Sequence, residues 1–329
     1  MGDGLSGIGV VAIGRNEGER LVRCLESTVA DGRPTVYVDS GSTDGSADAA
    51  RGLGAEVVDL DLSIPFTAAR ARNAGWRRLL ELDPELQAVL FLDGDCELAP
   101  GFLAAAAAVL AEEPSLAVAC GRRRERHPEA SLFNRLCDLE WDTPVGLAES
   151  CGGDALIRVE ALRSVDGYDD SAIAGEEPEM CFRLRGQGWK VRRIDAEMTL
   201  HDAAMTKVGQ WWQRSRRAGH AFASNLRRHR EAGFKRAEVR RAVLWGLALP
   251  AAILLGALAT PWVLLALLVY PLQAMRIARR LRHQRPGSGW SLAVAYGFAC
   301  MLGKFAEAVG VVGEARRHRR GEVALIEYK

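Results

Sequence analysis

Short apolar runs alternate with helical segments along the first third of the chain. Residues 8–13, 35–39 and 88–92 are brief and mostly apolar, as is typical of strands buried on both faces. Between them, residues 15–30 and 67–82 carry apolar side chains at helical spacing. Strands that alternate with helices at this spacing form right-handed βαβ units. The sequence therefore predicts an α/β fold whose sheet is mostly parallel and flanked by helices.

Further elements, and the length and composition of the chain, bound its organisation and its partners. Further along, the pattern predicts a strand over residues 116–120, helices over 132–141, 155–165 and 178–185, and a strand over 189–194. A chain of 329 residues can hold one large α/β domain and an appendage. With 43 basic and 42 acidic residues it has no overall attraction to nucleic acid, so none is expected as a partner. Seven cysteines without a CxxC pair fit a reducing cytoplasm.

Two carboxylates follow the strand over residues 88–92, at Asp93 and Asp95, with Gly94 between them. Open α/β sheets bind ligands at the carboxyl ends of their strands. The spacing of two directs both side chains to one side of an extended chain, and Gly94 lets a ligand approach the backbone. Carboxylate oxygens suit Mg²⁺ or Mn²⁺, usually shared with substrate phosphates. An Asp-Gly-Asp sequence also forms ordinary turns, so other motifs must decide.

A second group of polar residues stands where the first two strands end. Asn16 and Glu17 follow the first strand, and Asp39 ends the second. Two adjacent strand exits form a crevice that can hold a base and a ribose, and Asp39 can accept a hydrogen bond from a pyrimidine N–H. Arg72 lies early in the helix over residues 67–82, within reach of the same crevice, although an isolated arginine there is usually a surface residue. These residues are candidates for binding a nucleotide sugar.

Four segments in order, VVAIGRNE, VDSGSTDGS, ARARNAGW and FLDGDCEL, resemble the family 2 glycosyltransferases with the GT-A fold. The resemblance extends from the first strand to about residue 215. It implies an enzyme that uses a nucleotide diphosphate sugar. It also implies that Asp39 and Arg72 hold the base, that Asp93 and Gly94 lie beside the donor near the ribose, and that Asp95 binds the metal on the diphosphate.

A downstream segment, GGDALIRVEALRSVDGYDDSAIAGEEPEMCFRLRGQGWKV, resembles the acceptor segment of that family. The family motif is Gly-Glu-Asp before a helix, whereas this chain has Gly175, Glu176 and Glu177, so Glu177 replaces the catalytic Asp. The base therefore stays open between Glu177 and Glu176. Pro178 disfavours helical geometry at Glu177 and leaves that carboxylate near a helix N-terminus, where an anion is stabilised. The alternative is a pair of capping acids.

Two further residues extend the resemblance. His201, in TLHDAAMT, matches a histidine that many GT-A enzymes use as a metal or diphosphate ligand, although a lone histidine is more often structural. QWWQRSRRAG loosely resembles the QxxRW segment of processive relatives, but Gln210 and Arg214 are four residues apart instead of three. Arg214 would then cover the donor diphosphate. Trp211 and Trp212 would help it, or would dock the domain on a membrane surface.

The composition changes at Ala242, where 34 residues without a charge begin and run to Met275. Thr260-Pro261 interrupts them, and arginine clusters border both ends. Arginine-rich loops stay cytoplasmic, so residues 242–275 are expected to form a hairpin that either spans the membrane twice or enters and returns. A third apolar stretch, residues 290–313, contains Lys304 and Glu307 and is expected to be interfacial or packed on protein. A buried soluble helical subdomain is the alternative.

The expected division is a GT-A catalytic domain over residues 1–225 and a membrane-associated helical region over 226–329. The expected activity is inverting transfer of a sugar to a hydroxyl acceptor, lipid-linked or close to the membrane, at the cytoplasmic face of the inner membrane. A nucleotidyltransferase shares the sheet, the metal and the nucleotide, but no early Gly-rich, Lys-containing phosphate loop is present. A non-catalytic sugar-nucleotide-binding scaffold would be expected to lose Asp95 or the acidic pair.

Overall fold

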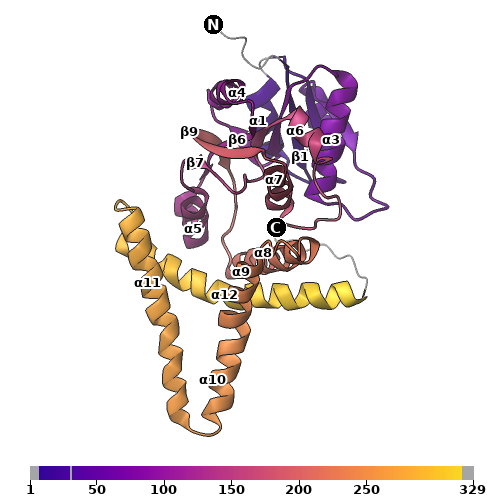
Figure 1. The fold of residues 1–329 in the computed structure, drawn as a ribbon. Coiled ribbons are helices and arrows are strands. Elements are labelled where there is room, and N and C mark those ends of the chain that lie inside the picture. Colours follow the sequence, from indigo (N-terminus) through magenta and orange to yellow (C-terminus); the bar gives the residue numbers. More distant parts are fainter. Residues whose placement is uncertain (1–6, 30–31, 321–329) are drawn as a thin grey trace. The chain divides into compact units, whose positions relative to one another are not determined.

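The computed structural model describes residues 7–29 and 32–320 (Figure 1). Its contacts divide the chain into two compact units, one up to Ala204 and one from Met205. The boundary expected at residue 225 lies inside helix α8 (Val208–Arg228). The division comes earlier because α8 packs along α12 (Trp290–Arg320) and therefore belongs to the second unit.

A nine-stranded mixed sheet forms the centre of the first unit. The strands follow the order β3-β2-β1-β4-β8-β6-β9-β5, and β7 pairs with β9. Their bounds are β1 Ile8–Gly14, β2 Thr35–Asp39, β3 Glu56–Asp59, β4 Ala88–Asp93, β5 Cys96–Leu98, β6 Leu116–Glu125, β7 Gly146–Leu147, β8 Ala155–Arg158 and β9 Lys190–His201. The first four strands in sequence are parallel to one another, as predicted.

The register of the parallel strands brings their carboxyl ends together. Gly14 at the end of β1 pairs with Asp39 at the end of β2. On the other side of β1, Ile13 pairs with Asp93 at the end of β4. The polar residues that follow these strands therefore stand along one edge of the sheet, where α/β folds bind ligands.

The helices of the first unit pack against this sheet. They are α1 Glu19–Val29, α2 Ser46–Gly52, α3 Ala68–Leu82, α4 Phe102–Glu112, α5 Leu132–Trp141, α6 Val159–Ser164 and α7 Glu176–Gly186. Thr67 caps α3, because its hydroxyl accepts a hydrogen bond from the Arg70 N–H at 3.1 Å. Helix α3 packs closely on β1: a methyl group at Gly75 would lie 2.4 Å from a Val11 methyl.

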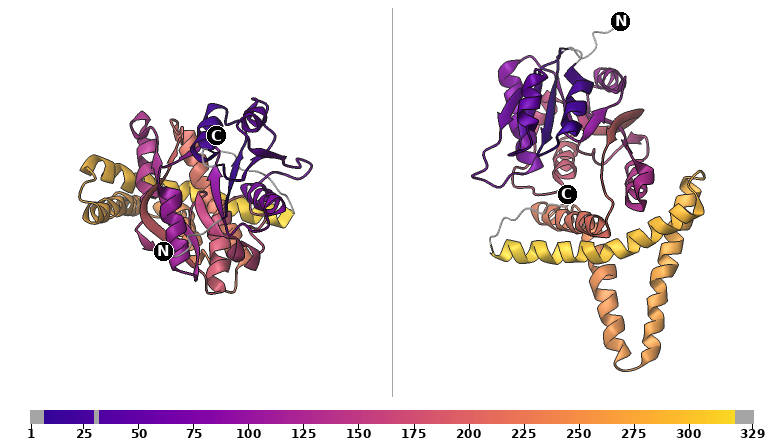
Figure 2. Two further views of the ribbon diagram at one scale, coloured as in Figure 1. Left: turned by 90° about the horizontal axis from the view of Figure 1, so that it is seen from above. Right: turned by 180° about the vertical axis from the view of Figure 1, so that it is seen from behind.

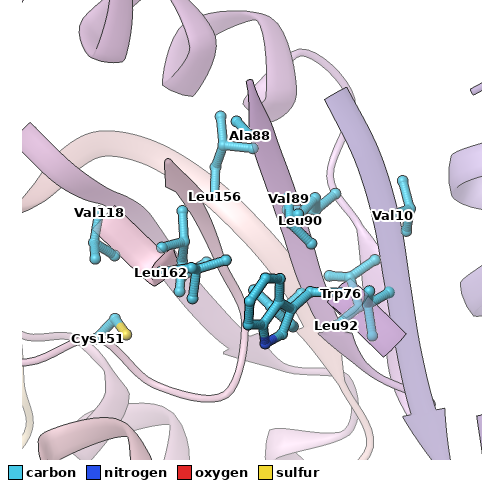
Figure 3. Close-up of a cluster of buried hydrophobic side chains, with 14 of the residues drawn as sticks. Val10, Trp76, Ala88, Val89, Leu90, Leu92, Val118, Cys151, Leu156 and Leu162 are labelled. Carbon is cyan, nitrogen blue, oxygen red and sulfur yellow. The ribbon is translucent and has the colours of Figure 1, made fainter. Parts of the chain in front are cut away.

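The core extends through both halves of the sheet. Val10 of β1, Trp76 of α3, Leu90 of β4 and Leu156 of β8 belong to one cluster of buried hydrophobic side chains (Figure 3). This cluster fixes α3 over the strands that end at the ligand-binding edge. It thereby fixes where Arg72, one turn before Trp76, emerges from the helix.

One predicted element is wrong. The helix expected over residues 155–165 is instead β8 followed by the short helix α6. Alanine and leucine favour a helix locally, but β8 is antiparallel to both β4 and β6 in the middle of the sheet. This central pairing outweighs helix propensity, and it brings residues 152–154 to the end of β4.

The second unit is helical. Its elements after α8 are α9 Arg236–Val243, η2 Leu244–Ala248, α10 Leu249–Ala257, η3 Pro261–Leu268, α11 Val269–Gln284 and α12. Three helical stretches, Arg236–Ala257, Pro261–Gln284 and Trp290–Arg320, are long and apolar enough to cross a membrane. The first two form the predicted hairpin, which the right-hand view of Figure 2 shows beside α12.

Candidate active site

Asp93, the last residue of β4, lies between two arginines. Arg72 of α3 donates to Asp93 Oδ1 at 2.7 Å, and Arg123 of β6 donates to Oδ2 at 3.3 Å. Burial opposes ionisation of Asp93, yet the two guanidinium groups outweigh it and lower the pKa of this carboxyl. Asp93 is therefore an ionised carboxylate whose orientation is fixed from both sides.

Arg72 also links Asp93 to the acidic pair. Its Nη1 donates to Glu176 Oε1 at 2.8 Å, and its Nη2 lies 3.5 Å from Glu177 Oε1. The sequence motifs DGD and GEE, more than 80 residues apart, thus meet at one buried guanidinium. The partners of Arg72 in the structure are these carboxylates.

The two glutamates differ in environment. The Glu177 side chain is 16% exposed, whereas Glu176 is 6% exposed and held by the shorter ion pair. Burial, and then repulsion from Glu176, raise the pKa of Glu177 to about 7, although Arg72 acts in the opposite direction. Glu177 can therefore exchange a proton near neutral pH, which suits a general base.

Helix α7 begins two residues earlier than predicted, at Glu176 instead of Pro178. Pro178 is accommodated because the N–H groups of the first turn have no partner within a helix. Gly175 precedes the helix with φ 75°, a left-handed conformation that glycine adopts without strain. Both glutamates thus stand in the first turn, where the helix dipole favours negative charge.

Asp95 and His201 face each other beyond the end of β4. Pairing of β5 with β9 places Cys96 opposite His201, and His201 Nε2 lies 3.4 Å from Asp95 Oδ1. The rings of Trp141 and His201 form a T-shaped pair with their centroids 4.8 Å apart, and the imidazole Nδ1 lies 4.0 Å from a carboxylate oxygen of Glu125. Burial acts to lower the pKa of His201, but the Asp95 carboxylate outweighs it and raises that pKa.

The chemistry of this group suits a divalent cation. Among the residues that the structure describes, Asp95, Cys96 and His201 bring an oxygen, a sulfur and a nitrogen within 4.8 Å of one another. The Cys96 thiol is a soft ligand, whereas Mg²⁺ and Mn²⁺ prefer oxygen, so it fits these cations least of the three. A second acidic group, formed by Asp93 and Asp154, is already paired with Arg123. Asp95 and His201 are therefore the pair with a donor set that fits a metal.

A polar network borders the predicted crevice between the exits of β1 and β2. Asp39 Oδ1 accepts from the Tyr37 hydroxyl at 2.9 Å, and Oδ2 accepts from the Ser42 N–H at 2.7 Å. The Asn16 side chain accepts from the Thr43 N–H at 2.8 Å. Asp39 thus orders the loop after β2, and Asn16 ties that loop to the exit of β1.

Glu17 and Gly94 lie together at the exits of β1 and β4. Glu17 pairs with Arg20 at 2.8 Å. A methyl group at Gly94 would lie 3.0 Å from the Ile13 carbonyl oxygen and 3.3 Å from Glu17 Cγ, so a side chain there would crowd the crevice. The structure thus brings Asn16, Glu17 and Gly94 to the same edge of the sheet.

Residues of the GGD segment were not among the predicted site residues. Asp154 is fully buried; it accepts from the Asp93 N–H at 3.0 Å and the Thr199 hydroxyl at 2.6 Å, and pairs with Arg123 at 2.7 Å. A methyl group at Gly153 would lie 2.5 Å from Asp93 Oδ2. In the sequence, the only sign of this role is the pair of glycines before Asp154. The helix predicted from residue 155 gave no reason to place these residues beside β4.

Arg214 lies in α8, within the second unit, and its role in binding the donor stays a prediction. Gln210 of the same segment has a local function, because its side chain accepts from the Lys207 N–H at 3.0 Å at the start of α8. Trp211 is buried, and a methyl group at Gly303 of α12 would lie 3.7 Å from its ring. Trp211 therefore packs inside this unit.

Comparisons with known proteins identify related sequences and structures. The model of glycosyl transferase family 2 matches residues 10–144, and that of glycosyl transferase family group 2 matches residues 88–303. The succinoglycan biosynthesis protein ExoA of Rhizobium meliloti (strain 1021) is 27% identical over 206 residues, which is 59% of this chain and 61% of that protein. The chain thus matches about three-fifths of the length of this curated relative.

Among solved structures, a mannosyltransferase from Pyrobaculum calidifontis in complex with GDP-Man and Mn²⁺ superposes with a TM-score of 0.53. The aligned part covers 93% of this chain and 86% of the mannosyltransferase chain, at 19% sequence identity. At this identity the likeness concerns the fold.

Proposed function

The chain belongs to glycosyl transferase family group 2, and we propose that it performs a metal-dependent, inverting transfer of a sugar from a nucleotide diphosphate sugar to a hydroxyl acceptor. Its class as a nucleotide-sugar glycosyltransferase follows from the family. The observation that carries the proposal is the link from Asp93 through Arg72 to the acidic pair. A donor held at the end of β4 would have its reacting carbon beside the first turn of α7.

Glu177 is the proposed base. Its carboxylate would take the proton of the acceptor hydroxyl as that oxygen attacks the anomeric carbon from the face opposite the diphosphate. One displacement inverts the configuration and needs no carboxylate nucleophile, unlike retaining glycoside hydrolysis. Glu176 is tied to Arg72 at 2.8 Å, which favours a supporting role for it. Arg72 would then hold the acid pair and Asp93 at fixed separation.

Asp95 and His201 are the proposed ligands of Mg²⁺ or Mn²⁺. When bound, the cation would neutralise negative charge that develops on the departing diphosphate. Mg²⁺ is usually bound by oxygen ligands, whereas imidazole suits transition metals, so the pairing of His201 with Asp95 favours Mn²⁺.

The donor nucleotide is proposed to occupy the crevice at the exits of β1, β2 and β4. Asn16, Glu17 and Asp39 would border the base and ribose, and Gly94 would leave room for the donor beside Asp93. Arg214 is proposed to contact the diphosphate. The hydrogen bonds to both oxygens of Asp39 orient it in advance, so little ordering would be required on binding.

The acceptor is proposed to be a membrane lipid or a lipid-linked hydroxyl. The hairpin of the second unit offers a means of attachment, and arginine clusters at both of its ends favour the cytoplasmic side. We therefore place the catalytic unit at the cytoplasmic face of the inner membrane. Nucleotide sugars are available on that side.

Release of nucleoside diphosphate tests this function. The full chain in detergent would be offered a panel of nucleotide sugars with Mn²⁺, with and without a membrane lipid extract as the source of acceptor. We expect release that depends on both the extract and the metal, and that Asp95→Ala or a chelator abolishes. Formation of nucleoside triphosphate and sugar 1-phosphate when pyrophosphate is added would indicate a nucleotidyltransferase. Donor binding without turnover under every condition would indicate a scaffold.

A further inference from the structure

Helix α12 lies across the base of the hairpin formed by residues 242–275. A methyl group at Gly246 would lie 2.0 Å from the Lys304 carbonyl oxygen, and one at Gly297 would lie 2.2 Å from the Ala274 carbonyl oxygen. These are contacts between helix backbones, one to each arm. Figures 1 and 2 both show α12 running crosswise to the two arms.

These two crossings lie near the ends of the uncharged stretch. Gly246 is four residues after its start, and Ala274 is next to its last residue. Charged residues begin immediately outside, at Arg241 and Arg276. Helix α12 therefore follows the border between the charged and uncharged parts of the hairpin, which is where the surface of a bilayer would lie.

Helix α12 is held at this level by an arginine-rich partner. A methyl group at Gly219 of α8 would lie 2.0 Å from the Glu307 carbonyl oxygen, and Arg227 of α8 pairs with the buried Glu314 at 2.9 Å. Lys304 and Glu307 form an ion pair of 2.6 Å on the same part of α12. Because charged groups are costly in hydrocarbon, α12 cannot cross the membrane while it keeps these contacts.

The hairpin is shorter than the hydrocarbon layer below α12. Fourteen residues lead from Gly246 to Thr260, and thirteen lead from Pro261 to Ala274. At rises per residue of about 1.5 Å in an α-helix and 2.0 Å in the 3-10 segment η3, each arm extends roughly 20–25 Å beyond α12. The hydrocarbon core of a bilayer is about 30 Å thick. The tip would therefore end before the far surface.

The chemistry of the tip agrees with that depth. Leu258 and Trp262 are 85% and 76% exposed, and Thr260 is the one hydrophilic residue between them. A loop that emerged into water on the far side would leave these side chains solvated. Inside the bilayer the apolar surface of both side chains is removed from water.

We propose that the second unit is monotopic: its hairpin enters one leaflet and returns to the same face, while α12 lies in the headgroup layer. The partner is a bilayer whose anionic headgroups meet the arginines at the base of the hairpin, among them Arg240, Arg241, Arg276, Arg279 and Arg280. Hydropathy alone indicates three spans, whereas this arrangement has none. It concerns the membrane unit only and is independent of the transfer chemistry.

Single cysteines at the tip and the base, and a double variant that carries both, test the topology. The background carries Cys300→Ser, because the other cysteines among the described residues are buried. Thr260→Cys marks the tip, where the side chain caps nothing. Gly287→Cys marks the base, in open space between α11 and α12. The full chain would be reconstituted into vesicles of phosphatidylethanolamine and phosphatidylglycerol and treated with a membrane-impermeant maleimide.

We expect Gly287→Cys to react in the outward-facing molecules and Thr260→Cys to stay unlabelled in intact vesicles, whichever way the protein faces. Both should react in detergent. If the label reaches Thr260→Cys in those molecules in which Gly287→Cys is protected inside the vesicle, the hairpin spans the membrane. Labelling of both in the same molecules would show that the hairpin is outside the bilayer. Protection of Thr260→Cys that persists in detergent would point to a second copy covering the tip; each of these three results overturns the proposal.

Discussion

At the scale of single residues, the charge balance around Arg72 explains why one glutamate of the pair differs from the other. Arg72 forms close ion pairs with Asp93 and Glu176, at 2.7 and 2.8 Å, and lies 3.5 Å from Glu177. Asp93 is also paired with Arg123, so the main difference lies between the two glutamates. Burial, and then repulsion from the Glu176 carboxylate, raise the pKa of Glu177 to about 7, which places its proton exchange near neutral pH.

Replacement of each glutamate by glutamine separates their roles. Glu177→Gln keeps the shape but removes the proton acceptor, so turnover should fall by about 100-fold or more while donor binding changes little. Glu176→Gln should act mainly through Arg72 and retain more turnover. Initial rates and donor binding, measured for both variants of the full chain, check this. If Glu176→Gln is the inactive variant, the base is one residue away from our assignment.

The pH dependence of transfer should show the raised pKa of Glu177. The base works when ionised, so kcat/KM should fall as the pH drops through about 7. The stability of the folded state should change with pH in the opposite direction to kcat/KM. The folded pKa exceeds the unfolded one, so the contribution of this group is present below the unfolded pKa and is lost as pH rises through about 7. Glu177→Gln should therefore raise Tm more at pH 8 than at pH 5. Equal wild-type kcat/KM at pH 6 and pH 8 would argue against this base.

The buried Asp154 should matter more for stability than an exposed ion pair. Asp154→Asn leaves Arg123 without its closest partner, and breaking a buried pair costs roughly 3–5 kcal/mol. Asp166→Asn is the matched control, because its side chain is 89% exposed and asparagine tolerates its positive φ. The control should change stability by about 0–1 kcal/mol. Thermal unfolding of both full-length variants decides; similar Tm values would show that the Asp154 network is not structural.

Some site residues could be predicted from sequence and others could not. Asp93 and Asp95 stand at the end of a buried strand, and Glu177 stands in the first turn of a helix. Both positions are visible in the linear sequence. Arg123 and Asp154 acquire their role from the pairing of β6 and β8 in the middle of the sheet, which no local pattern records. Their neighbours in the fold are about 30 and 60 residues away in sequence.

At the scale of elements, the same distinction separates correct from incorrect predictions. The parallel strands β1, β2 and β4 were predictable because each is buried on both faces and flanked by helices. The segment from Ala155 was predicted as a helix because its alanine and leucine carry no strand signal of their own. Its conformation is decided by β4 and β6 on either side.

The contact of α8 with α12 offers a prediction at this scale. A methyl group at Gly310 would lie 2.1 Å from the Arg216 carbonyl oxygen, whereas one at Gly313 meets only the flexible end of Arg317 at 3.8 Å. Gly310→Ala should therefore force the helices apart and lower Tm. Gly313→Ala should leave Tm unchanged or raise it slightly, because alanine favours a helix by about 0.5–1 kcal/mol over glycine. Equal Tm values for the two full-length variants in detergent would contradict close packing at Gly310.

At the scale of the whole molecule, one chain combines a nucleotide-sugar fold with an apolar hairpin. The first unit supplies the carboxylates and arginines of the site, and the second supplies the helices suited to a bilayer. Hydropathy and charge predicted the hairpin. The assignment of α8 to the second unit could not be predicted, because its polar sequence gives no sign of its packing along α12.

The configuration of the product tests the central claim most directly. The full chain in vesicles would be given a donor labelled with ¹³C at the anomeric carbon, and the linkage formed would be identified by NMR. A single displacement assisted by Glu177 predicts the anomeric configuration opposite to that of the donor. Retention would mean that the acceptor bond forms on the face from which the diphosphate leaves, and it would contradict the account.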